Sequence, residues 1–165
     1  MNHPQHATWE RLLTLLAEAQ SLFQEYVSLL SHEERTLRIM DRQGLTDVNS
    51  QKEQVLDAMC RLEQQVEREL RQLGGPEVHE SIRSWLQKAR DPRAQSAHGL
   101  LTELLRLADT IQKQGKKNES LIRRIQHRVG EAIHFMYTGV GTGPVYQGSG
   151  TLNFPSVPSS VHLQG

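Results

Sequence analysis

The feature that most constrains this chain is an apolar pattern with alternating steps of three and four residues, which extends over residues 101–136. This spacing places its members on one face of a single helix. The positions are Leu101, Leu104, Ala108, Ile111, Gly115, Asn118, Ile122, Ile125, Val129, Ala132 and Met136. The phase is the same on both sides of Gly115, and an interior glycine costs only about 1 kcal/mol relative to alanine. We therefore expect one continuous helix over residues 92–137, capped by Asp91 and opened by Pro92.

The first part of the chain predicts three more helices, near residues 6–43, 47–73 and 77–90, of which the third is short. The first repeats the three-four spacing, and a second row of leucines widens its apolar face, as a helix with two neighbours requires. Its positions are Trp9, Leu12, Leu16, Ala19, Phe23, Tyr26, Leu30, Glu33, Leu37 and Met40. We expect an all-α antiparallel bundle of long helices, because short connections make successive helices run in opposite directions.

Glycine and proline mark the expected helix ends. Gly44 predicts the end of the first helix, since glycine enters the left-handed conformation without a Cβ penalty. The second helix has two candidate starts, a cap at Thr46 or Asp47 and a capping box that begins at Ser50. Pro76 fits the first turn of the third helix. The residues expected in the core are Leu16, Phe23, Leu30, Val55, Met59, Leu62, Leu104 and Ile111.

The last 28 residues differ from the rest of the chain because they contain no Asp, Glu, Lys or Arg. They are rich in Gly, Ser and Pro, so we expect a helical domain at residues 1–137 and a flexible tail at residues 138–165. The tail nevertheless holds eight sizeable apolar residues: Val140, Val145, Tyr146, Leu152, Phe154, Val157, Val161 and Leu163.

Composition excludes several classes of function. Basic and acidic residues number 19 each, so no overall charge favours nucleic acid or an anionic membrane. Cys60 is the only cysteine, which excludes a disulfide framework. No stretch has the apolar length of a signal peptide or a membrane span, so we expect a soluble cytoplasmic protein without membrane insertion. His127, Glu131 and His134 have a spacing that metal ligands use, but nothing supplies a second shell, and we expect a solvated face with no metal or cofactor.

We also expect no enzymatic activity, since a catalytic triad, a phosphate-binding loop and a zinc motif are all missing from the sequence. One clear charge asymmetry remains. Six cations stand against one glutamate over residues 113–128: Lys113, Lys116, Lys117, Arg123, Arg124 and Arg128. Such a stretch could contact nucleic-acid phosphates, but no aromatic residue lies among them. A solvated face, or a site for an acidic protein surface, is the favoured interpretation.

Several short motifs follow one another along the chain. The first half has a Leu-Leu-x-x-Glu helix end at residues 29–33, a turn, and a Lys-x-x-x-Leu helix start at residues 52–56. Asn118-Glu-Ser-Leu121-Ile122 follows in the last helix, and Tyr146-Gln-Gly-Ser-Gly150 follows in the tail. In this order the motifs resemble the FlgN-like family of flagellar export chaperones over most of the chain.

The resemblance implies a chaperone that holds the hook–filament junction proteins FlgK and FlgL and delivers them to the export gate protein FlhA. Cargo helices would pair with the end of the last helix and so lose their exposed apolar surface. The expected cargo-binding residues are Ile122, Ile125, Val129, Ile133 and Met136, here named the terminal apolar face. In the free protein they should be more exposed than residues 101–111, or else covered by a second copy or by the tail. Tyr146 is the expected contact for the export gate.

Two other functions stay open at this point. The long helix could pair with its own copy, which would make the protein a self-assembling dimer, or residues 113–128 could serve a nucleic-acid adapter. The tail also has two possible arrangements. It could fold over residues 122–136 as a placeholder that cargo displaces, or it could be an end without contacts.

Overall fold

The computed structural model describes residues 3–76, 81–138, 145–146 and 152–153. Within these residues the chain forms four helices: α1 (His3–Arg38), α2 (Arg42–Gln72), α3 (Ile82–Lys88) and α4 (Pro92–Thr138). The all-α class and the antiparallel bundle are confirmed. Strands β1 (Val145–Tyr146) and β2 (Leu152–Asn153) pair antiparallel, with Tyr146 opposite Leu152. The remainder of the predicted flexible tail lies outside the described residues.

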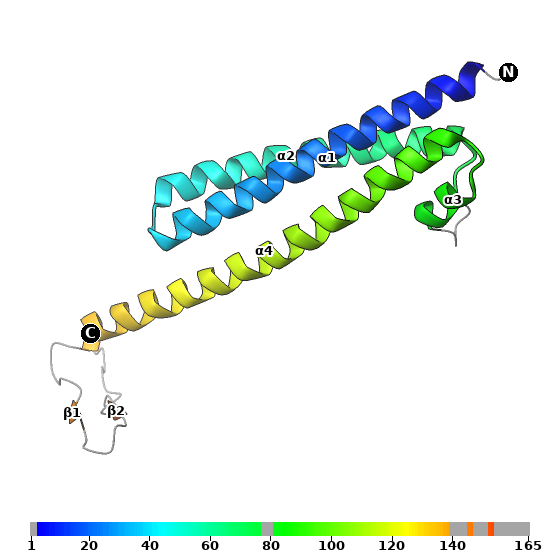
Figure 1. Cartoon of the computed structure of the whole chain (residues 1–165). Helices are drawn as coiled ribbons and strands as arrows, with labels where there is room; N and C mark the ends of the chain where they lie inside the picture. Colours follow the sequence, from blue (N-terminus) through cyan, green and yellow to red (C-terminus); the bar gives the residue numbers. More distant parts are fainter. Residues whose placement is uncertain (1–2, 77–80, 139–144, 147–151, 154–165) are drawn as a thin grey trace, which may run out of the picture. The chain divides into compact units, whose positions relative to one another are not determined.

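The chain divides into two compact units, Met1–Ile122 and Arg123–Gly165. In the first unit α1 and α2 form a long antiparallel pair (Figure 1). Two ion pairs fix their register, Arg11 with Glu69 at 3.8 Å and Glu33 with Lys52 at 2.8 Å. Helix α4 returns parallel to α1.

Contacts near both ends of the first unit show this parallel register of α1 and α4. Arg93 donates to the His6 carbonyl at 3.2 Å, and Asn118 donates to the Leu30 carbonyl at 2.8 Å. The predicted continuity through Gly115 is confirmed, and the 47 residues of α4 correspond to a length of about 70 Å.

The apolar core of the first unit lies where all four helices meet. It contains Trp9, Leu12, Leu16, Leu70, Leu86, Ala94, Ala97 and Leu104. Short helix α3 contributes more than expected, since Leu86 is buried and Trp85 stacks on Trp9 with ring centroids 5.7 Å apart. Such stacking adds about 0.5–1.5 kcal/mol to the burial of the rings.

Burial of the predicted core residues is confirmed for five of them: Leu16, Leu30, Val55, Leu62 and Leu104. The prediction is wrong for Phe23, Met59 and Ile111, which are only half-buried. A slender bundle explains the difference. A small domain buries a small share of its surface, and a helix with two neighbours keeps much of its circumference in solvent.

The predicted end of the first helix at Gly44 is wrong. Helix α1 ends at Arg38, and Met40 takes the left-handed conformation, with φ +54°. The Met40 amide donates to the Leu37 carbonyl and the Asp41 amide donates to the Thr36 carbonyl, at 3.3 and 3.1 Å. These two bonds define a Schellman motif, a helix end in which glycine usually takes the position of Met40.

The predicted caps of the second helix at Thr46, Asp47 or Ser50 are also wrong. Asp41 is the N-cap, and its side chain accepts a hydrogen bond from the Gly44 amide at 3.0 Å. Gly44 therefore lies inside the first turn of α2. An aspartate cap satisfies one of the amides that a helix start leaves without a partner.

The other helix ends follow the expected chemistry more closely. Helix α2 closes at Gly74, with φ +70°, in a second Schellman motif. Asp91 caps α4 as predicted, since its Oδ1 accepts from the Arg93 amide at 2.9 Å. Helix α3 is shorter than expected, because Ser81 caps it and Pro76 precedes it outside any helix. No helix in the described part of the chain has the length and apolarity to cross a membrane.

Candidate functional site

The exposure of α4 changes along its length. Leu104 and Leu107 are buried, and Asn118, which is 2% exposed, is the last buried residue. Residues 119–137 are all half-buried or exposed. The apolar pattern itself continues without interruption, so α4 presents in its last turns the kind of surface that it buries in its first turns.

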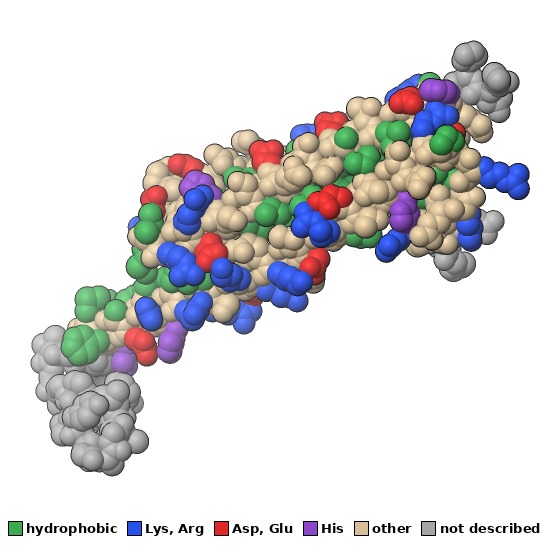
Figure 2. Space-filling model, in the orientation of Figure 1, with side chains coloured by type: hydrophobic (Ala, Val, Ile, Leu, Met, Phe, Trp, Pro, Cys, Tyr) green, Lys and Arg blue, Asp and Glu red, His purple; other side chains and the backbone are tan. Residues whose placement is uncertain are grey.

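The terminal apolar face lies in this exposed part. Ile122 and Ile125 are half-buried, whereas Val129, Ile133 and Met136 are 42%, 44% and 66% exposed. Figure 2 shows hydrophobic side chains gathered around the last turns of α4, beyond the lysines and arginines of its middle. Val129, Ile133 and Met136 thus have the exposure that a binding role requires, whereas Ile122 and Ile125 are half-buried like Leu101 and Ile111. The role of the face in cargo binding stays a prediction.

Two further residues of this region were not predicted as site residues. Phe135 and Tyr137 are 62% and 85% exposed, on either side of Met136. The three-four pattern omits them, because residues 135 and 137 point about 100° away from residue 136 on a helix. A run of three large apolar residues before an uncharged segment was the signal that could have identified them.

A polar cluster lies at the point where the burial of α4 ends. Its inner part joins three helices around the carboxylate of Glu33, which is buried. Lys52 of α2 donates to Oε1 at 2.8 Å, and Asn118 of α4 donates to Oε2 at 2.7 Å. The Asn118 amide also donates to the Leu30 carbonyl. Both carboxylate oxygens therefore have partners, as a buried charge requires.

The outer part of the cluster surrounds Glu34. Lys117 and Gln114 donate to its Oε2 at 2.9 and 2.8 Å, and Arg38 donates to its Oε1 at 2.7 Å. Hydrogen bonds from Lys117, Arg38 and Gln114 lower the pKa of Glu34 to about 2. Gln114 also donates to Asn118 Oδ1 at 3.0 Å, so it links the outer part to the inner part.

The sequence carried a signal for the inner part of this cluster. Glu33, Lys52 and Asn118 each occupy a position that the three-four spacing otherwise gives to an apolar residue. Each of the three long helices thus contributes one polar residue to this contact, Glu33 from α1, Lys52 from α2 and Asn118 from α4. Which of them meet depends on the register of the three helices, and that register is visible only in the structure.

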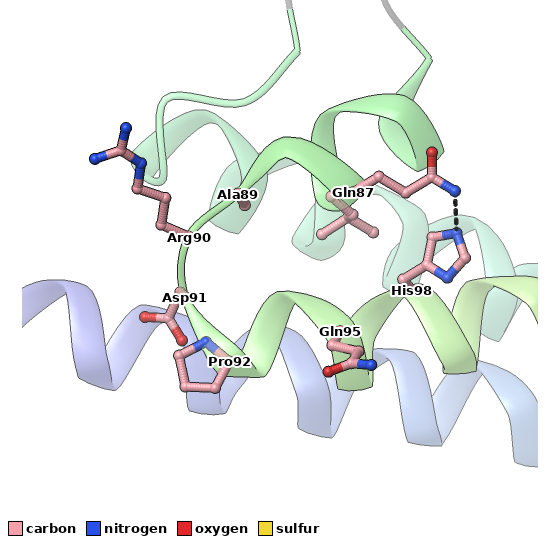
Figure 3. A pocket seen from close by; sticks show the side chains of 8 residues that line it. Gln87, Ala89, Arg90, Asp91, Pro92, Gln95 and His98 are labelled. Carbon is pink, nitrogen blue, oxygen red and sulfur yellow. Dashed lines mark hydrogen bonds between the residues drawn. The ribbon is translucent and has the colours of Figure 1, made fainter.

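A hollow of about 430 Å³ lies between α3 and the start of α4 (Figure 3). Gln87 and His98 point toward each other across it, with their nitrogen atoms 3.2 Å apart. Asp91 is engaged by Arg93, whose hydrogen bonds lower the pKa of that carboxyl. Asp91 and His98 are thus held by their neighbours, and we assign the hollow a packing role.

The other predicted site residues have mixed outcomes. Tyr146 lies in β1, and the structure describes its backbone pairing alone. His127 and Glu131 form an exposed pair at 3.3 Å, as expected for a solvated face. In the basic stretch, Lys113 pairs with Asp109 at 2.7 Å and Lys117 belongs to the polar cluster. Part of the basic stretch therefore has a structural role that the sequence analysis missed.

A helical bundle with a long helix and an exposed apolar end is an architecture typical of proteins that bind other polypeptides. Comparison with known families gives this class an identity. The family model described as FlgN protein matches residues 1–153, and the chain belongs to the FlgN family. This is a family of flagellar export chaperones, not a family of enzymes. No curated protein and no solved structure matches the chain.

Proposed function

We propose that this protein holds hook–filament junction proteins of the FlgK and FlgL type in the cytoplasm before their export, and that the terminal apolar face binds them. The observation that supports this is the exposure of Val129, Ile133 and Met136 on a helix whose preceding turns are buried. Membership of the FlgN family gives the class of partner.

The mechanism is helix pairing. An amphipathic helix of the cargo would lie along the terminal apolar face and lose its own apolar surface to it. Each methylene buried in this way contributes about 0.8 kcal/mol. The cargo end would become ordered as it binds, so part of this gain offsets its conformational entropy. The cargo is thereby kept from aggregating and remains easy to release.

The test is the double variant Val129→Asp/Ile133→Asp in the full chain, measured by calorimetric titration with purified FlgK-type and FlgL-type proteins. We expect the affinity to fall at least about tenfold, because two buried charges would face the cargo. The matched control is Leu105→Asp, an exposed leucine of α4 in the first unit. It should leave binding intact.

The thermal midpoint of the double variant decides whether the face is a surface or core. Substitutions at exposed positions change stability by about 0.5 kcal/mol each, so the midpoint should move little. A large fall in the midpoint, or unchanged cargo binding, would contradict the assignment. Dimers that dissociate only in the double variant would favour a second copy of this chain as the occupant.

We further propose that Tyr146 contacts the export gate protein FlhA, since an aromatic anchor can contribute well above 1 kcal/mol to an interface. The variants that test it are Tyr146→Ala and a truncation before Thr138. If the tail is a placeholder over residues 122–136, the truncation should hold or raise cargo affinity and lower gate affinity. Gate and cargo affinities that both stay unchanged would remove Tyr146 as a site.

A further inference from the structure

The last turn of α4 has an arrangement of apolar side chains that one protein groove does not cover. Phe135, Met136 and Tyr137 are consecutive and all strongly exposed. Successive helix residues point about 100° apart, so Phe135 and Tyr137 lie on nearly opposite sides of the helix with Met136 between them. A groove or a partner helix contacts one face and would leave at least one ring in water. Fluid acyl chains can close around all three.

The charges of the same segment are mainly positive. Residues 123–138 hold three arginines, Arg123, Arg124 and Arg128, and one acid, Glu131, which gives a net charge of +2. Glu131 pairs with His127 at 3.3 Å. The neutral total charge of the chain therefore conceals a basic segment, which complements an anionic surface.

The spacing of these groups matches the layers of a lipid interface. Seven residues separate Arg128 from Phe135, which is about 10 Å along a helix. Apolar side chains of interfacial helices reach about 5–10 Å into the headgroup–acyl boundary, and a helix that meets the surface with its last turn spans this depth while its arginines remain among the headgroups. Phenylalanine and tyrosine suit the same depth. Beyond Tyr137 the sequence contains no charged residue that would oppose this position.

We propose that the terminal segment of α4, residues 123–138, binds the surface of an anionic lipid bilayer. The last turn enters the boundary between headgroups and acyl chains, and the arginines contact the headgroup phosphates. The segment docks without crossing. This inference uses the exposure and charge of the segment alone and does not rest on the proposed cargo. Since Val129, Ile133 and Met136 belong to both surfaces, lipid and an apolar partner would compete for them.

The test is sedimentation of the full chain with large vesicles. Vesicles of phosphatidylethanolamine and phosphatidylglycerol should carry the protein down at low salt and release it at high salt. Vesicles of phosphatidylcholine should bind it far more weakly. Absence of binding to the anionic vesicles, or equal binding to both kinds, would overturn the proposal.

Two variants test the two halves of the surface. Phe135→Ser/Met136→Ser/Tyr137→Ser should abolish sedimentation, whereas Ile39→Ser, at an equally exposed apolar position of the first unit, should not. Replacing Arg123, Arg124 and Arg128 by glutamine should weaken binding on the order of a hundredfold, since each cation near an anionic surface contributes about fivefold.

The matched control for charge is Arg35→Gln/Arg42→Gln/Arg61→Gln, which removes the same charge from exposed positions of α1 and α2. If it weakens binding as much as the α4 variant, the net charge and not the segment is responsible, and the proposal fails. Retention of the chain on immobilised polyglutamate without binding to anionic vesicles would assign the segment to an acidic polypeptide and would also overturn it.

Discussion

Replacing Asn118 by alanine should destabilise the bundle by about 2–3 kcal/mol. The side chain is 2% exposed and donates to the Leu30 carbonyl and to Glu33 Oε2. A neutral hydrogen bond contributes about 0.5–1.5 kcal/mol, and one to a charged group contributes about 1.5–3 kcal/mol. The higher helix propensity of alanine returns about 0.6 kcal/mol. Most of the loss arises because a buried carboxylate oxygen remains without its donor.

Urea unfolding followed by circular dichroism measures this loss. An m-value equal to that of the unchanged protein indicates that the variant has kept the same fold. The matched control is Asn49→Ala, at an exposed position of α2. It should be neutral or slightly stabilising. A loss below about 0.5 kcal/mol at Asn118 would refute the argument, because it would mean that water replaces the donor at Glu33 without cost.

The triple variant Glu33→Leu/Lys52→Leu/Asn118→Leu separates hydrogen bonding from packing. Replacing all members of a buried polar group by apolar residues is often neutral or stabilising, whereas removing one partner is costly. We therefore expect the triple variant to be more stable than Asn118→Ala. A triple variant less stable than the single one would mean that the cluster contributes a net favourable energy beyond its own desolvation.

Three further outcomes follow from single residues. The pKa of Glu34 lies at about 2, below its ordinary 4.5. The stability that Glu34 contributes should therefore be complete above pH 4.5 and lost as the pH falls toward 2. Glu34→Gln should remove this part of the acid unfolding curve. Met40→Gly should raise the unfolding free energy by about 1 kcal/mol, because it relieves the left-handed strain, whereas Ile39→Gly should lower it. Gly115→Ala should stabilise α4 by about 1 kcal/mol, since the added Cβ would meet open space. Gly44→Ala should destabilise α2, since the added Cβ would collide with the Asp41 carboxylate. Urea unfolding measures both changes.

Much of the fold could be predicted from periodicity and caps, and the errors have local causes. The three-four pattern of the first helix continues to Met40, so it suggested a helix that reaches Gly44. In the structure the chain turns at Met40. This turn allows Leu37, before it, and Val48, after it, to be buried together. A methionine in the left-handed conformation contradicts the usual preference for glycine, and only the packing of both helices selects it.

The candidate site was predictable to a different degree. Exposure of the terminal apolar face was expected from its assignment to cargo binding, and Val129, Ile133 and Met136 are exposed. The polar cluster was not predictable as a unit. Glu33, Lys52 and Asn118 are far apart in the sequence. From the sequence alone, each could equally be an isolated polar residue in the apolar pattern of its own helix. Their meeting depends on interhelical register, to which a repeating apolar pattern is insensitive.

Because the apolar pattern does not fix the register of the helices, the polar cluster has a role besides its contribution to stability. Because the apolar positions of α4 repeat every three or four residues, α4 could slide along α1 by one turn and still bury leucine or isoleucine. Such a slide moves the Asn118 amide from Glu33 into apolar surroundings, which costs about 1–3 kcal/mol for each group left without a partner. The cluster therefore selects one register, as a single buried asparagine does in coiled coils. With the register fixed, the number of α4 turns left exposed beyond Asn118 is fixed too, and the terminal apolar face keeps a constant length.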